Sequence, residues 1–88
     1  MIVSYRPSFH RDIKNITDKR LKTIIEQAVI SVKTAKTPKE IPNLKKLKGH
    51  KISYRIKVGD YRIGVEIESD IVTFMAFGHR KDIYKIFP

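Results

Sequence analysis

The chain has no cysteine, few acidic residues and no clustered histidines. Without cysteine it forms no disulfide, no thiolate metal site and no cysteine nucleophile. Its nine acids face 19 Lys or Arg, and His10, His50 and His79 do not have the spacing of metal ligands. We therefore expect no bound metal, no other cofactor and no metal-dependent hydrolase chemistry.

Long apolar runs are also missing. No stretch approaches the roughly 20 apolar residues of a membrane-spanning helix. The first residues, Met-Ile-Val-Ser-Tyr, lack the charged and apolar regions of a signal peptide. We expect a protein without a membrane association, in the cytoplasm, where the lack of cysteine suits a reducing environment.

What the chain has in excess is positive charge. Its net charge is +10, and residues 33–57 contain nine Lys or Arg against the single acid Glu40. Such an imbalance indicates phosphate-rich partners rather than any particular fold. With 88 residues, 41% of them hydrophobic, the chain is expected to form a single domain, 1–88, with one modest core.

A β-hairpin is predicted around Gly59-Asp60, because glycine supplies the positive φ that tight hairpin turns require. This turn would place Val58 opposite Tyr61 and Lys57 opposite Arg62. Side chains alternate between the faces of a sheet. One face therefore receives the apolar residues of the two strands, Tyr54, Ile56, Val58, Tyr61, Ile63, Val65 and Ile67.

The other face of this hairpin receives Arg55, Lys57 and Arg62. Like charges directly across two strands repel and lower stability. A single surface cation is usually only solvated, but three on one face of one hairpin indicate a site for an anion.

The remaining pattern predicts a strand at Ile2–Tyr5, followed by a helix with Ser8 as its N-cap. The apolar residues Phe9, Ile13 and Ile16 recur at helical spacing and would face the core. A second helix starts at Thr17-Asp18 with Asp18 in its first turn. Its apolar stripe consists of Leu21, Ile24, Ile25, Ala28, Val29 and Val32.

The second half of the chain predicts a single turn over 44–49 and strands near 51–58, 61–67 and 71–78. The last strand is apolar on both faces, as an inner strand would be. The fold class is therefore α+β, with a helical hairpin packed on a mainly antiparallel four-stranded sheet in the order β-α-α-β-β-β.

RNA can be cut without a metal, because its own 2′-hydroxyl attacks the adjacent phosphate. The protein then supplies a base, an acid and positive charge for the transition state. Lys57 is the best candidate base, because an arginine stays protonated whereas a lysine beside other cations gives up its proton more readily. Arg62 suits bidentate phosphate contact. Arg80, after the last strand, could reach the same site as a clamp, and its alternative role as proton donor to the leaving group rests on the family resemblance given below.

Tyr84 either packs beside Ile83 and Phe87 or points into the basic face. His79 is either a surface histidine or a further contact of the site. Tyr54 and Tyr61 are expected in the core. Non-specific contacts to the RNA backbone are expected from six further basic residues. These are Lys45, Lys46, Lys48, Lys51, His79 and Lys81.

Three motifs in this order resemble the RelE/ParE superfamily of bacterial and archaeal toxins, in particular its RelE-like messenger-RNA interferases. The resemblance covers nearly the whole chain. The motifs are Leu44-Lys45-Lys46-Leu47-Lys48-Gly49, Tyr54-Arg55-Ile56-Lys57-Val58-Gly59-Asp60-Tyr61-Arg62 and Gly78-His79-Arg80-Lys81-Asp82-Ile83-Tyr84.

The resemblance implies an endoribonuclease that cleaves messenger RNA in the ribosomal A site and that a co-encoded acidic antitoxin neutralises. It implies an active site of Arg55, Lys57, Arg62 and Arg80, with Tyr84 contacting the RNA. The chain differs from the family pattern in having Arg55 where relatives often have lysine, so the division of roles between positions 55 and 57 stays open.

Two alternatives remain. ParE-like members of the superfamily share the fold but inhibit DNA gyrase without cutting RNA. The chain could also be a non-catalytic RNA-binding module that uses its basic face for adhesion alone.

Overall fold

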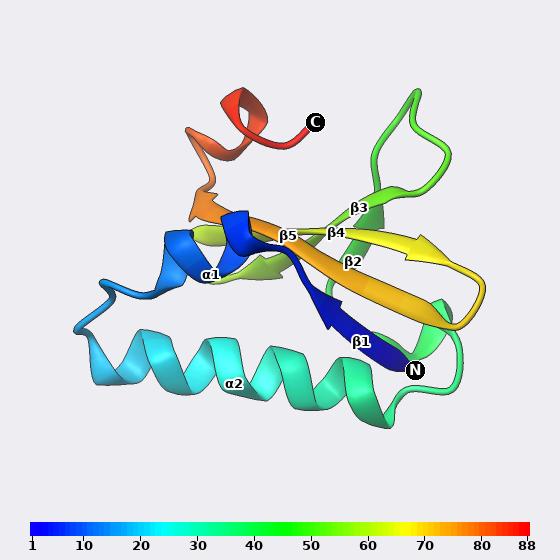
Figure 1. Ribbon diagram of the computed structural model, residues 1–88, viewed down its shortest axis with the longest axis horizontal. Helices are drawn as coiled ribbons and strands as arrows, with labels where there is room; N and C mark the ends of the chain where they lie inside the picture. The colour runs from blue at the N-terminus through cyan, green and yellow to red at the C-terminus, as the bar shows by residue number, and fades with distance from the viewer.

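The computed structural model describes residues 1–88 as a five-stranded sheet with two helices on one of its faces (Figure 1). The predicted α+β class is confirmed, but the sheet has five strands rather than four. The elements in chain order are β1 (Ile2–Tyr5), α1 (Pro7–Ile13), α2 (Lys19–Thr34), the 3₁₀ turn η1 (Pro38–Glu40), β2 (Leu44–Lys46), β3 (Ser53–Val58), β4 (Tyr61–Glu68), β5 (Ile71–His79) and the 3₁₀ turn η2 (Ile83–Lys85).

The additional strand is β2, in the segment predicted to be a single turn. It pairs antiparallel with β3, with Leu44 opposite Ile56 and Lys45 opposite Arg55. Asn43 and Gly49, on either side of it, have φ values of 61° and 84°. Asparagine and glycine tolerate this left-handed region, so the chain can turn into and out of a short edge strand at these two positions.

The predicted hairpin register is confirmed at every pair from Val58–Tyr61 to Arg55–Gly64. Gly59 has the positive φ, 59°, that the turn requires. Because side chains alternate along both strands, this register alone decides which residues of β3 and β4 face the helices.

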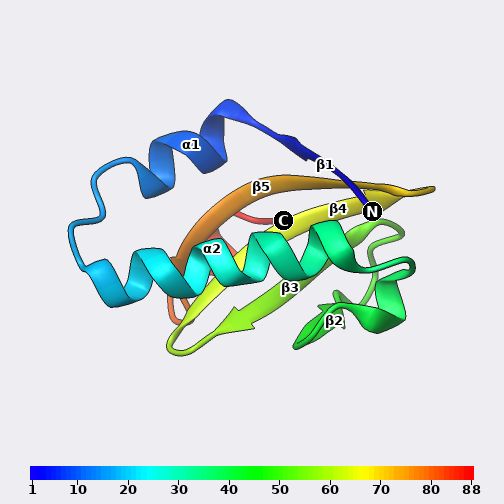
Figure 2. The ribbon, with the colours of Figure 1, turned by 90° about the horizontal axis from the view of Figure 1, so that it is seen from below.

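The strand order is β1-β5-β4-β3-β2, with β1 parallel to β5 and the other pairs antiparallel. The predicted inner position of the last strand is therefore confirmed. Where β1 stops after Tyr5, α1 takes its place along β5 (Figure 2). The carboxylate of Asp12 accepts a hydrogen bond from the main-chain N–H of Phe77 at 3.0 Å.

The start of α1 differs from the prediction that Ser8 caps it. The helix begins at Pro7 after Arg6, because proline lacks an N–H and its fixed φ suits the first helical turn. The hydroxyl of Ser8 instead donates to the carbonyl of Met75 on β5 at 2.5 Å. The helix ends at Ile13, so Ile16 lies beyond it.

The second helix begins after Asp18, which is its N-cap rather than a residue of its first turn. The Asp18 side chain accepts from the main-chain N–H groups of Arg20 and Leu21 at 2.9 and 3.2 Å. These bonds satisfy two of the free donors at the helix start. No helix of the structure combines the length and the apolar character that crossing a membrane requires.

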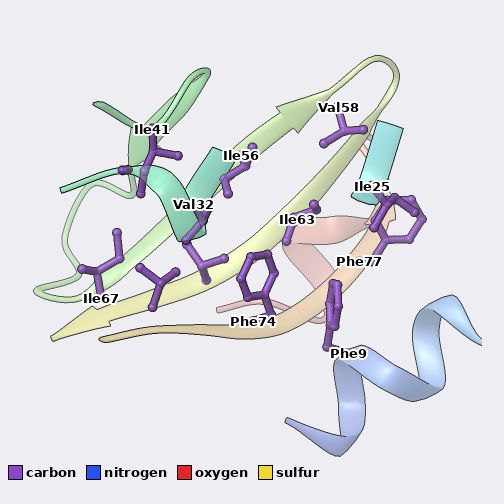
Figure 3. Packing of buried hydrophobic residues seen from close by; sticks show 13 residues of the cluster. Phe9, Ile25, Val32, Ile41, Ile56, Val58, Ile63, Ile67, Phe74 and Phe77 are labelled. Atoms are coloured by element: carbon purple, nitrogen blue, oxygen red, sulfur yellow. The ribbon is translucent and has the colours of Figure 1, made fainter. Parts of the chain in front are cut away.

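The main core lies between the helices and the sheet, where Phe9 of α1, Ile25 and Val32 of α2 and Phe74 of β5 meet (Figure 3). Tyr54 and Tyr61 pack against it and are only partly buried. On the opposite face the segment after β5 crosses the sheet (Figure 1). There Ala76, Ile83 and Phe87 form a second, smaller cluster.

Candidate functional site

A groove of about 660 Å³ lies beside β2, β3 and β4, and we call it the basic groove. Six of its nine lining residues are Lys or Arg and none is acidic. The lining residues are Asn43, Leu44, Lys45, Lys46, Leu47, Lys48, Arg55, Lys57 and Arg62. The predicted cations of the hairpin and three of the predicted backbone-contacting lysines are thus brought together around one depression.

Strand pairing sets the positions of the central cations. Lys57 lies directly opposite Arg62, and Lys45 lies directly opposite Arg55. Both pairs occupy the sheet face away from the helices, because Ile56 and Ile63 of the same strands are buried in the core. Two like-charged cross-strand pairs oppose folding, and a bound anion removes that repulsion.

No acid neutralises the basic groove. The structure contains one salt bridge, between Lys85 and Asp82 at 3.8 Å, and neither residue lines the groove. The side chain of Lys57 is exposed and makes no hydrogen bond within the protein. Its ammonium group is therefore available to a substrate.

Arg62 is held at the hairpin turn. Its Nη1 donates to the carbonyls of Gly59 at 3.0 Å and Tyr61 at 2.8 Å. These bonds orient the guanidinium while its Nε and Nη2 make no hydrogen bond within the protein. A guanidinium fixed on one side can still offer two donors to a phosphate on the other.

Arg55 is attached to the segment that follows β5. Its Nη2 donates to the carbonyl of Phe87 at 3.0 Å, and its buried Nε has no partner. The Phe87 ring covers Gly64, where a Cβ atom would lie 2.3 Å from the ring atom Cδ2. Of the two cations on β3, Lys57 is thus the free one and Arg55 the attached one.

The other predicted site residues do not line the basic groove. The main-chain N–H of Arg80 donates to the carbonyl of Asp60 at 2.8 Å, which fixes residue 80 beside the hairpin turn. The Arg80 side chain is exposed. Lys51 is exposed in the loop between β2 and β3, and Lys81 is exposed after β5.

His79 and Tyr84 lie on different sides of the sheet. The ring of His79 meets Tyr61 edge-on, with centroids 5.4 Å apart, and Tyr61 stacks on the core residue Phe77. His79 therefore faces the helix side, away from Arg62. Tyr84 is 60% exposed, whereas Ile83 beside it is buried, so Tyr84 is not a core residue.

Sequence reasoning did not find the contribution of Phe87 or the apolar part of the groove, Leu44 and Leu47. The signal for Phe87 was Gly64, directly opposite Arg55, since a glycine inside a strand often marks a close approach by another group. The structure contains no group of three or more His, Cys, Asp or Glu side chains placed to hold a metal ion.

This geometry can bind a phosphodiester. Lys57 and Arg62 present positive charge from adjacent strands, and the surrounding lysines extend that charge along β2. Preorganised cations of this kind stabilise negative charge that develops on a phosphate.

The chain matches a family model described as the ParE toxin of type II toxin–antitoxin system, parDE, over residues 3–84. It therefore belongs to this toxin family. It is 40% identical over its whole length, and over the whole of the relative, to Toxin RelE3 of Methanocaldococcus jannaschii. The chain is thus a RelE toxin homologue and a toxin of a type II toxin–antitoxin system.

One solved structure supports the same family, and a second supports the fold. The toxin in a RelB–RelE antitoxin–toxin complex from Methanococcus jannaschii is 38% identical, covers 97% of this chain and 99% of its own, and has a TM-score of 0.67. YoeB from Staphylococcus aureus, solved as a dimer, is 15% identical with a TM-score of 0.73, covering 91% of this chain and 97% of its own. At that identity the likeness to YoeB shows the fold alone.

Proposed function

We propose that this toxin is an endoribonuclease that cuts messenger RNA in the ribosomal A site without a metal ion and so inhibits translation in the cytoplasm. The observation that carries the proposal is the direct pairing of Lys57 with Arg62 in a groove lined by six cations and no acid. Membership of the RelE-like toxins supports the same activity.

In the proposed reaction the 2′-oxygen of the RNA attacks the adjacent phosphorus. The bond from phosphorus to the 2′-oxygen forms, and its bond to the 5′-oxygen breaks. Lys57 in its unprotonated form accepts the proton of the 2′-hydroxyl, and a protein donor returns a proton to the 5′-oxygen. Arg62 stabilises the charge on the phosphorane-like transition state. The products carry a 2′,3′-cyclic phosphate and a 5′-hydroxyl.

We assign the remaining residues by their surroundings. Arg80, which lies beside the hairpin turn, is the candidate proton donor or clamp, and the exposed ring of Tyr84 is the candidate contact to a base. Arg55 adds charge to the groove although one of its nitrogens is bound to Phe87. The peripheral RNA contacts are assigned to Lys45, Lys46, Lys48, Lys51, His79 and Lys81.

We further propose a cognate acidic antitoxin as the protein partner. The 38%-identical relative was solved as a complex with its RelB antitoxin. The net charge of +10 favours an acidic protein as the neutralising partner, because opposite charges speed association. A partner that covered the basic groove would block the RNA.

A second candidate function is inhibition of DNA gyrase without RNA cleavage, since the matching family model is that of ParE toxin. The cation-lined groove favours the ribonuclease function over gyrase inhibition.

The ribonuclease function is tested by incubating purified protein with intact ribosomes and messenger RNA and mapping the cut positions by primer extension. A gyrase supercoiling assay on the same preparation tests the second candidate. Inhibited supercoiling without any cut messenger would overturn the nuclease proposal.

A further inference from the structure

A second cavity, of about 590 Å³, lies on the other side of the edge strand β2, and we call it the Tyr54 pocket. It is an open depression beside η1, β2 and β3. Its lining residues are Thr37, Pro38, Lys39, Ile41, Leu44, Lys46 and Tyr54. None of the proposed catalytic residues lines it, so the mechanism above gives it no role.

The Tyr54 pocket and the basic groove adjoin each other on the two sides of β2. Leu44 and Lys46 line both cavities. Between them lies only β2, an edge strand of three residues with no neighbour on its outer side. Lys45 and Lys46 are consecutive on it and project to opposite faces of the sheet. A flexible chain bound in the groove therefore meets positive charge on both sides of this strand.

The chemistry of the Tyr54 pocket fits one nucleotide. Tyr54 lines the pocket and is half-buried, and its hydroxyl makes no hydrogen bond within the protein. Lys39 and Lys46 are exposed on the lining, which contains no carboxylate. An aromatic ring for a base beside ammonium groups for a phosphate is the combination that single-strand binders use.

We propose that the Tyr54 pocket is a subsite for one nucleotide of the RNA chain that flanks the cleavage position. This rests on the proposed ribonuclease function. The base packs against Tyr54, and the adjoining phosphate lies between Lys39 and Lys46. The RNA chain passes from the basic groove over β2 to reach it. An acidic protein segment is disfavoured as the occupant, because Tyr54 offers an aromatic ring for a base and the pocket adjoins the groove proposed to hold the RNA.

The test uses single-stranded 2′-O-methyl oligonucleotides about 12 nucleotides long, within the range of site sizes for single-strand binders. The methyl group removes the attacking hydroxyl, so binding is measured by fluorescence anisotropy without cleavage. A set of abasic oligonucleotides, each lacking one base, locates the position whose base contributes to affinity. We expect that removing the base at one position of the oligonucleotide, a position that lies outside the basic groove, lowers the affinity for wild-type protein about tenfold.

A double-mutant cycle, which combines each abasic oligonucleotide with a substitution in the protein, identifies the residue that contacts the base. In Tyr54→Leu the loss of affinity caused by that one missing base should disappear, whereas in Tyr54→Phe the loss should remain. Tyr5→Leu is the matched control, since Tyr5 is a partly exposed tyrosine on the opposite edge strand and lines neither cavity. Melting curves identify any variant that fails to fold.

Lys39→Gln keeps the proposal testable if Tyr54→Leu unfolds, because Lys39 is an exposed residue of η1. It should weaken oligonucleotide binding and lower its salt dependence, while Lys22→Gln on α2 should not. If no abasic position couples to Tyr54 and Lys39→Gln behaves as Lys22→Gln does, the subsite is wrong. Cleavage by the wild type in the ribosome assay would then still support the proposed function.

Polyglutamate distinguishes a nucleotide site from a general site for acidic chains. If Tyr54→Leu weakens polyglutamate binding as much as oligonucleotide binding, the pocket recognises an acidic protein segment and the proposal is overturned. An unchanged affinity for polyglutamate, together with a coupled abasic position, supports it.

Discussion

The carboxylate of Asp12 accepts a hydrogen bond from the main-chain N–H of Phe77, 3.0 Å away across the edge of the sheet. β1 ends at Tyr5, so the amides of β5 beyond its paired portion would have no partner strand on that side. Asp12 of α1, together with Ser8, which bonds the carbonyl of Met75, substitutes for the missing strand. A short helix is thereby attached to the strand that ends beside the site.

Asp12→Ala should therefore lower the free energy of unfolding by about 1.5–3 kcal/mol, as expected when a charged acceptor is removed from a main-chain donor. Urea denaturation of the purified variant measures this change. Asp12→Asn keeps an acceptor oxygen and should recover part of the loss. Glu26→Gln, at an exposed position of α2, is the matched control and should stay near the wild type. A loss of equal size in the control would contradict the assigned bond.

Lys57→Ala and Arg62→Ala should each abolish growth arrest when the toxin is expressed. Both variants should fold, because each removes one charge of a repelling pair from the open face of the sheet. The free energy of unfolding of Lys57→Ala should lie within about 0.5 kcal/mol of the wild type. That of Arg62→Ala should fall by about 1 kcal/mol, because the hairpin turn also loses the two hydrogen bonds that Arg62 donates. Lys22→Ala on α2 should remain toxic. A variant that loses toxicity only because it melts far below the wild type would make that residue structural.

Cleavage should continue in excess EDTA when other cations keep the ribosomes intact. The product should end in a 2′,3′-cyclic or 3′-phosphate, because the attacking group is the 2′-hydroxyl of the substrate itself. End-group analysis of the cut RNA checks this. A 3′-hydroxyl end, or equal cutting of a substrate with a single 2′-deoxy position at the cleavage site, would falsify the mechanism.

Tyr84→Ala should weaken the interaction with substrate by about 1–3 kcal/mol, as base–aromatic stacking contributes. Tyr84→Phe keeps the ring and should retain most activity. Because Tyr84 is 60% exposed, neither substitution should lower stability by the roughly 3–5 kcal/mol of a core aromatic. Cleavage rates and thermal unfolding of the two variants are compared. Normal specific activity in Tyr84→Ala would remove this residue from the site.

Gly64→Ala should destabilise the protein by about 1–3 kcal/mol, because the new methyl group would overlap the ring of Phe87. The double variant Gly64→Ala/Phe87→Leu should be more stable than the sum of the single changes predicts, since the collision is removed. Thermal or urea unfolding of the three proteins provides the coupling energy. Additive losses would show that Phe87 does not rest on Gly64 in solution.

The hairpin could be predicted in full because the turn residues and the alternation of side chains together fix its register. The same register predicts that Lys57 and Arg62 lie opposite each other. Strand β2 was missed, because a lysine-rich segment of three residues has little strand preference of its own and is specified by pairing with β3. The attachment of Arg55 to Phe87 was missed for a similar reason, since it depends on a tertiary contact between distant parts of the chain.

The parallel pairing of β1 with β5 also determines the order in which the molecule can assemble. The strand made first finds its partner only in the strand made last, so on a translating ribosome β1 stays unpaired until nearly the whole chain has emerged. The β3–β4 hairpin, with Lys57 and Arg62, needs only neighbouring residues and can form earlier, since short loops close at lower entropic cost. The completed sheet that supports the toxin's cations is therefore a late product of synthesis, and a chain interrupted before β5 carries the charges without the scaffold that holds them.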